Sequence, residues 1–252
     1  MPGSVYSARS SDSMEEEKKA AQRTSIQLFY ACITGFVGSV FFLMSFASPY
    51  WLASWADTQS PFLNMGLWEF CFDRFRFPKN QYDRMFDGCA PIWGTEYREI
   101  REWMTPWWLM LVQLMAALSF MLIFLALIID ACLLLRMPME HVLRFEANLV
   151  YCTFIMKAGV TVLLFLCVAL FGGMCWDREW LLYPNYNYPS WSYALACFAM
   201  LIHGGAAFLM FLEAVMARER KQRNAALLMQ MYPTDSRFGT GSLSTYHGSG
   251  YI

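Results

Sequence analysis

Few side chains in this sequence could do chemistry, and most of them lie in apolar surroundings. There are eight cysteines, but none shows the CxxC spacing of a zinc site. Only Cys71 and Cys89 lie in a polar, aromatic segment, and a bridge between them would require an oxidising compartment. The chain contains no HExxH pair and no GxSxG turn, and its apolar stretches carry no paired carboxylates. We therefore expect no enzymatic activity, metal or cofactor.

Three ionisable residues, Asp130, Lys157 and His203, fall inside apolar stretches. Asp130 and Lys157 lie near the same end of their stretches, where the lysine can extend to the membrane interface and where the two could pair. His203 falls near the middle of its stretch, and an ionisable group at such a place suggests a function. Because a single histidine makes a poor proton relay, a neutral ring hydrogen-bonded between helices is the favoured interpretation.

Four long apolar runs must position these groups. Hydrophobic residue types make up 57% of the 252 residues and charged types only 15%, whereas a soluble domain carries about a quarter charged residues. Each run can cross roughly 30 Å of hydrocarbon as a helix. The runs cover about 26–49, 107–135, 149–175 and 191–216. A cleaved signal peptide is the alternative for the first run, but its apolar region should be shorter and nearer the N-terminus. We expect one four-span membrane domain over residues 26–216.

Basic residues predict how the spans are oriented. Four basic residues follow the fourth run within 218–223, and three precede the first run within 18–23. Both tails, 1–25 and 217–252, are therefore expected in the cytoplasm of a plasma-membrane protein. The loops at about 50–106 and 176–190 are then extracellular, so that both loop cysteines face the oxidising side. The formal net charge of −1 offers no basic face for nucleic acid.

The long loop has the composition of a folded unit. Tyr50 to Trp55 and Gly66 to Phe72 are short and aromatic-rich, as strands are, and Cys89 to Trp93 could be another strand. Helical spacing of apolar residues within 96–108 predicts a short helix that leads into the second span. A small extracellular sheet cannot build a large core, so a disulfide would help to hold it.

Small residues recur every four positions in the first span, at Ala31, Gly35 and Ser39. Such a stripe allows another helix to approach closely. Packing within the four-helix bundle is favoured over dimerisation.

Two candidate sites lie on the expected cytoplasmic side. Cys132 falls where the second span meets the cytoplasm and is a candidate for S-palmitoylation, with an unmodified buried thiol as the alternative. The chain ends in Tyr251 and Ile252, and a free carboxylate after an apolar residue suits strand addition to the groove of a PDZ scaffold protein. Gly250 departs from the usual preferences of such grooves.

The most specific pattern lies in the first loop, in the order Trp51, Gly66-Leu67-Trp68, Cys71 and Cys89. With four spans and cytoplasmic tails, the chain resembles the claudin and epithelial-membrane-protein superfamily, whose first extracellular loop carries these residues in this order. The resemblance implies an all-α membrane four-helix bundle with a small extracellular antiparallel β-sheet. It also implies a disulfide between Cys71 and Cys89.

The resemblance assigns architectural roles to the loop residues. It implies that Trp51, Gly66, Leu67 and Trp68 anchor the sheet on the bundle near the lipid surface. Members of the family commonly have an arginine before the second span, and Arg101 is favoured over Arg98 for that place. The two cysteines stand further apart than in typical vertebrate claudins. The inserted stretch, Phe72 to Gly88, makes the chain most similar to the divergent claudin-like proteins of invertebrate septate junctions.

The function implied is that of a structural component of a septate- or tight-type junction at lateral cell–cell contacts. Such a component would contribute to the paracellular barrier and would contact other junction membrane proteins, and itself in cis and trans. Aromatic residues at loop tips could supply the contacts: Phe75, Phe77, Trp180 and Tyr183 to Tyr188. Charges in the insertion nearly balance, which favours a barrier over a charge-selective pore. The alternative is an auxiliary subunit of an ion channel or receptor.

Overall fold

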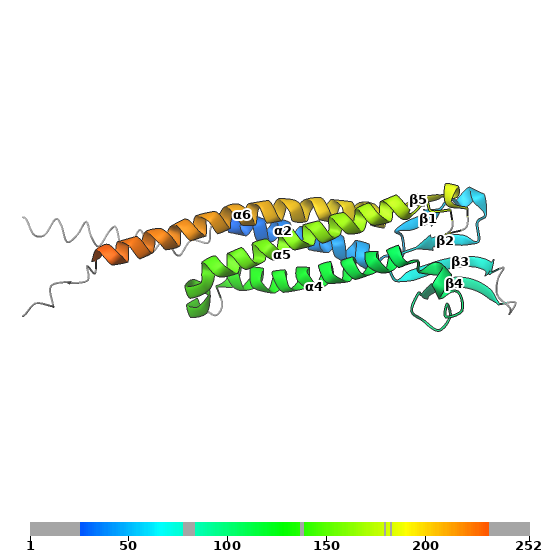
Figure 1. Cartoon of the computed structure of the whole chain (residues 1–252), viewed down its shortest axis with the longest axis horizontal. Coiled ribbons are helices and arrows are strands. Elements are labelled where there is room, and N and C mark those ends of the chain that lie inside the picture. The colour runs from blue at the N-terminus through cyan, green and yellow to red at the C-terminus, as the bar shows by residue number, and fades with distance from the viewer. Residues whose placement is uncertain (1–25, 78–83, 137–138, 179, 182, 232–252) are drawn as a thin grey trace, which may run out of the picture.

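Four long helices form a bundle that carries a small sheet at one end (Figure 1). The computed structural model describes residues 26–77, 84–136, 139–178, 180–181 and 183–231. The helices are α2 (Ile26–Ala47), α4 (Trp107–Leu135), α5 (Met139–Met174) and α6 (Trp191–Met231). Each is long and apolar enough to cross a membrane. Helix α6 packs against α2 and α5, and α4 packs mainly against α5.

Two of the helices extend beyond the apolar runs that predict them. Helix α5 already begins at Met139, and α6 continues to Met231. Both extensions are rich in residues with high helix propensity, such as Ala, Leu, Met, Arg and Glu, and lack proline and glycine. A helix need not end where the membrane ends, so hydropathy alone does not predict these boundaries.

The sheet has five antiparallel strands in the order β4-β3-β2-β1-β5. The strands are β1 (Leu52–Ser54), β2 (Phe62–Met65), β3 (Glu69–Arg76), β4 (Met85–Pro91) and β5 (Asn187–Pro189). Short helices η1 (Ala56–Thr58) and η2 (Pro184–Tyr186) precede β2 and β5, and α3 (Arg101–Met104) precedes α4. The first four strands come from the long loop, and β5 comes from the loop between α5 and α6. The all-α bundle with a small antiparallel sheet is confirmed.

Strands β2 and β5 were not expected from the sequence. They contain only four and three residues, and β5 ends in a proline, which strands tolerate at an edge. Strand β5 pairs with β1 through three residue pairs, Leu52 with Pro189, Ala53 with Tyr188 and Ser54 with Asn187. Pairing across the fold, rather than local propensity, makes these segments strands.

The small-residue stripe of α2 packs inside the bundle, as the favoured interpretation predicts. Ala31 and Ser39 are buried. A Cβ added at Gly35 would overlap Lys157 Nζ and lie 3.8 Å from Ala206 Cβ. A Cβ at Gly38 would lie 3.1 Å from the His203 ring. Glycine therefore lets α2 approach the polar side chains of α5 and α6 closely.

Those polar side chains form a buried group in the bundle. Lys157 Nζ donates to Asp130 Oδ2 at 2.6 Å, and both side chains are almost fully buried. The expected pairing is therefore present, but the lysine lies inside the bundle and does not extend to the interface. His203 is buried as well, yet within the described part of the chain neither ring nitrogen has a hydrogen-bond partner. The expectation of a hydrogen-bonded histidine is wrong, because the ring faces Gly38 of α2, which has no side chain to accept or donate.

Candidate functional site

Trp51 joins the sheet to the helix bundle. Its side chain is fully buried, and its indole N–H donates to the Ser45 carbonyl at 2.8 Å. Its ring meets Phe171 of α5 and Tyr193 of α6 edge-on, at centroid distances of 5.1 and 6.0 Å. The Trp51 backbone N–H donates to the Met65 carbonyl at the end of β2. One residue thus contacts three helices and the neighbouring strand.

The Gly66-Leu67-Trp68 segment forms the turn between β2 and β3 against the end of α2. A Cβ at Gly66 would overlap the Ser48 carbonyl oxygen and lie 2.6 Å from Pro49 Cα. Leu67 is fully buried, and its carbonyl accepts a 2.7 Å hydrogen bond from Gln113 of α4. Sequence reasoning missed Gln113, a buried polar residue of α4. Its one visible signal is an amide in an otherwise apolar run.

Replacing Gly66 with Ala should destabilise the junction between sheet and bundle. The added methyl group would overlap backbone atoms, which cannot move aside as a flexible side chain can. Overpacking of this kind costs about 1–3 kcal/mol. We expect a lower melting temperature of the purified protein in phosphatidylcholine nanodiscs. Gly173→Ala is the control, because a Cβ there meets no atom within 4 Å. Equal melting temperatures for the two variants would contradict the close approach at Gly66.

Cys71 and Cys89 form a disulfide across β3 and β4, where they are directly opposed. Tyr97 supports the same pair of strands, because its hydroxyl donates to the Phe70 carbonyl at 3.0 Å. Burial, with the nearby Glu96 carboxylate, raises the pKa of Tyr97 to about 12. The phenol therefore stays protonated at neutral pH and keeps its donor role.

Arg101 organises the segment that leads into α4. Its Nε donates to the Ile92 carbonyl at 3.1 Å and its Nη2 to the Gly94 carbonyl at 2.8 Å. The guanidinium also lies over the Trp93 ring, 5.4 Å from the centroid. These contacts fold the chain after β4 back toward α3. Arg98 is exposed, and its side chain has no such contacts among the described residues.

The aromatic residues that were expected at the loop tips divide into two groups. Phe75 and Trp180 are buried, so the expectation that they supply intermolecular contacts is wrong. Phe75 stacks on Phe72 and Trp103, and the Trp180 indole donates to the Met104 carbonyl at 3.0 Å. These rings fill the core between the sheet and the segment around α3, which composition alone does not reveal. Among the other predicted residues, Tyr183 and Tyr186 are exposed, and Trp55 and Trp93 are further exposed aromatic side chains near the sheet.

The remaining predicted sites lie outside the sheet. Cys132 is half-buried near the end of α4 that is remote from the sheet. Tyr251 and Ile252 lie outside the described residues.

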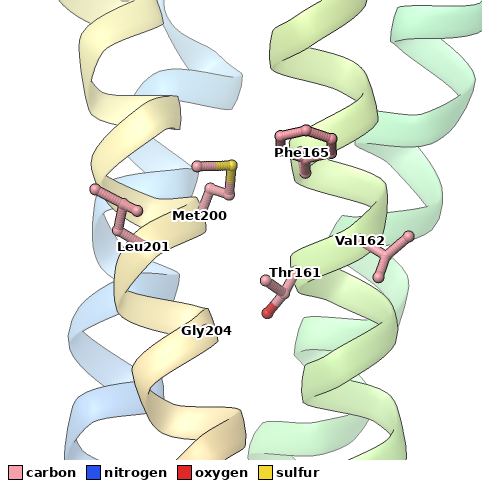
Figure 2. Close-up of a pocket in the computed structure, with 6 residues that line it drawn as sticks. All are labelled: Thr161, Val162, Phe165, Met200, Leu201 and Gly204. Carbon is pink, nitrogen blue, oxygen red and sulfur yellow. The ribbon is translucent and has the colours of Figure 1, made fainter.

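A lateral hollow of about 300 Å³ opens between α5 and α6 (Figure 2). Val162, Phe165 and Leu201 at its rim are more than half exposed, as lipid-facing side chains are. The Thr161 hydroxyl donates to the Lys157 carbonyl, so this hollow presents mainly hydrocarbon and a thioether from Met200. No group at this place is suited to catalysis.

Comparison with known proteins identifies a family for the helix bundle and its sheet. The family model described as PMP-22/EMP/MP20/Claudin tight junction matches residues 36–212. The match includes most of the bundle and the whole sheet. No individual curated protein matches the chain.

Proposed function

Since the chain belongs to the PMP-22/EMP/MP20/claudin family, whose members are structural membrane proteins rather than enzymes, we propose that it contributes to the paracellular barrier of a septate- or tight-type junction. The observation that carries this proposal is a sheet joined to the bundle by the close contacts of Trp51 and Gly66, with Arg101 binding the segment between β4 and α4. A rigid support can present exposed side chains to neighbouring molecules at fixed positions. Its partners would be other junction membrane proteins and further copies of itself, in cis and in trans.

The proposed orientation places the sheet outside the cell and both termini in the cytoplasm. The Cys71–Cys89 disulfide supports an oxidising environment for the sheet. At the opposite end of α6, Arg218, Arg220 and Lys221 lie on exposed helix, as the positive-inside rule requires of a cytoplasmic end. With this orientation, Cys132 remains a candidate for palmitoylation and the C-terminus for a PDZ scaffold.

Depletion of the protein from an epithelium tests the proposal. We expect a small fluorescent tracer to cross the depleted cell layer faster than the control layer, and a tagged copy to lie at lateral junctions. Re-expression of the wild-type chain should restore the barrier. An epithelium that stays tight, with the tagged protein elsewhere, would overturn the junction proposal.

The barrier should show little charge selectivity. Arg74 and Asp73 form an ion pair at 3.3 Å, and Asp87 and Arg84 lie exposed on and beside β4. Exposed charges are screened over about 8 Å at physiological salt. Reversing one of them, as in Asp87→Lys, should change the ratio of sodium to chloride permeability by less than about twofold. Dilution potentials across monolayers measure this ratio, and a large shift toward anions would indicate a pore lined by this face.

A further inference from the structure

A hollow of about 450 Å³ opens at the end of the sheet that is remote from the bundle. Strand β1 leaves the bundle at Trp51, so its last residue, Ser54, lies at this far end. The wall of the hollow continues through η1 to the start of β2, and Asp73 and Arg74 of β3 close it. Its volume lies within the range of about 300–1,000 Å³ that is common for small-ligand sites.

Two residues of this wall have a strained backbone. Gln59 has φ 47° and Arg74 has φ 44°. The left-handed region is disfavoured for residues with a Cβ, and such strain tends to concentrate at ligand sites. Of the four described non-glycine residues at positive φ, two line this single hollow. At Arg74 the strain coincides with the register shift between Phe72 and Phe75, which turns the strand at this point.

The polar groups in the hollow combine donors and acceptors without net charge. Asp73 and Arg74 neutralise each other through their 3.3 Å ion pair. The Ser60 hydroxyl accepts the Phe62 N–H at 3.3 Å and keeps its own proton for donation. The Gln59 amide is exposed and has no partner among the residues that the structure describes. A ligand that carries many hydroxyl groups and no charge matches this set.

An aromatic platform stands beside these polar groups. The Trp55 side chain is 56% exposed and borders the hollow. Its ring packs on Tyr188 of β5, with centroids 4.3 Å apart, so the indole is held in place. The C–H face of a pyranose ring packs well on such a surface, while its hydroxyl groups point to the polar wall.

We propose that this hollow binds a neutral carbohydrate, such as a terminal sugar of a cell-surface glycan. The Asp73–Arg74 pair leaves no net charge in the hollow that would favour an anionic or a cationic ligand over a neutral one. A glycan as the natural ligand rests on the proposed extracellular orientation of the sheet. Binding by the purified protein does not depend on that orientation or on the junction function, so the two proposals can fail separately.

The test uses the full chain in phosphatidylcholine nanodiscs, because maltoside detergents would compete for a sugar site. An array carries lactose, N-acetyllactosamine, chitobiose and mannobiose, together with sialylated and sulfated forms of the first two. We expect binding to at least one neutral disaccharide. Trp55→Ala and Gln59→Gly should each weaken that binding at least fivefold.

Two matched controls separate binding from folding. Trp176→Ala removes a tryptophan of similar exposure elsewhere, and Asp87→Asn removes an exposed carboxylate from β4. Both should bind like the wild type. Gln59→Gly removes the amide and relieves the left-handed strain, so its melting temperature should not fall while its binding does. No binding to any neutral sugar, preference for the charged sugars, or unchanged binding by Trp55→Ala and Gln59→Gly would overturn the proposal.

Discussion

Replacing Lys157 with Met is expected to reduce greatly the amount of folded protein that reaches the cell surface. The substitution removes the ammonium group that donates a hydrogen bond to the Asp130 carboxylate at 2.6 Å. The carboxylate then stays buried in the bundle without that group. Removing one partner of a buried ion pair typically costs about 3–5 kcal/mol. Surface biotinylation and the melting temperature in nanodiscs measure the two effects.

The double variant Asp130→Leu with Lys157→Met distinguishes the effect of an unpaired buried charge from the effect of changing the size and shape of these side chains. It contains no uncompensated charge, so most of the lost stability and surface expression should return. Arg223→Met is the exposed control, because it breaks the Arg223–Glu219 pair, whose side chains are 73% and 57% exposed. That pair should contribute no more than about 0.5 kcal/mol. A double variant as unstable as Lys157→Met alone would show that the charges themselves are not the cause.

Removing the disulfide is the second change with a large expected effect. The variant Cys71→Ala with Cys89→Ala opens a loop whose ends are 18 positions apart. The chain-entropy model predicts a loss of about 3 kcal/mol for a loop of this size. Because β3 and β4 pair across this bond, the sheet should unfold at a lower temperature than the helix bundle, which circular dichroism in the far ultraviolet can follow.

Cys152→Ser is the matched control for this change. Cys152 is a free, exposed thiol of α5, so the unfolding of the sheet should not change in this variant. The double alanine variant should also lose the barrier in the tracer assay, because a loosened sheet no longer holds its exposed residues at fixed positions. Wild-type stability in the double variant would mean that strand pairing alone holds the sheet.

Hydropathy located the four long apolar helices, because burial in lipid would require long apolar runs whatever the helices pack against. The second run, about 107–135, coincides with α4. Hydropathy did not predict that α5 begins at Met139 or that α6 continues to Met231. These extensions depend on helix propensity in water, which is a separate property of the sequence.

The motif in the long loop was also readable from the sequence, because its residues meet local constraints. Glycine at position 66 is required by a backbone that passes too close for any Cβ, and two cysteines in one loop are natural partners for each other. The sequence did not identify Gln113 or the burial of Trp180. Both depend on a contact with a residue more than 40 positions away.

Thus the sequence alone determined the number of spans, the presence of a small sheet and the family resemblance, since all three follow from local composition and spacing. Only the tertiary structure decided that β5 joins β1, that Lys157 lies inside the bundle beside Gly35, and that Trp55 and Gln59 border one hollow. Each of these depends on which distant segments come together. The free energy of such a contact depends on two residues together, and no local sequence pattern links residues that lie far apart in the chain.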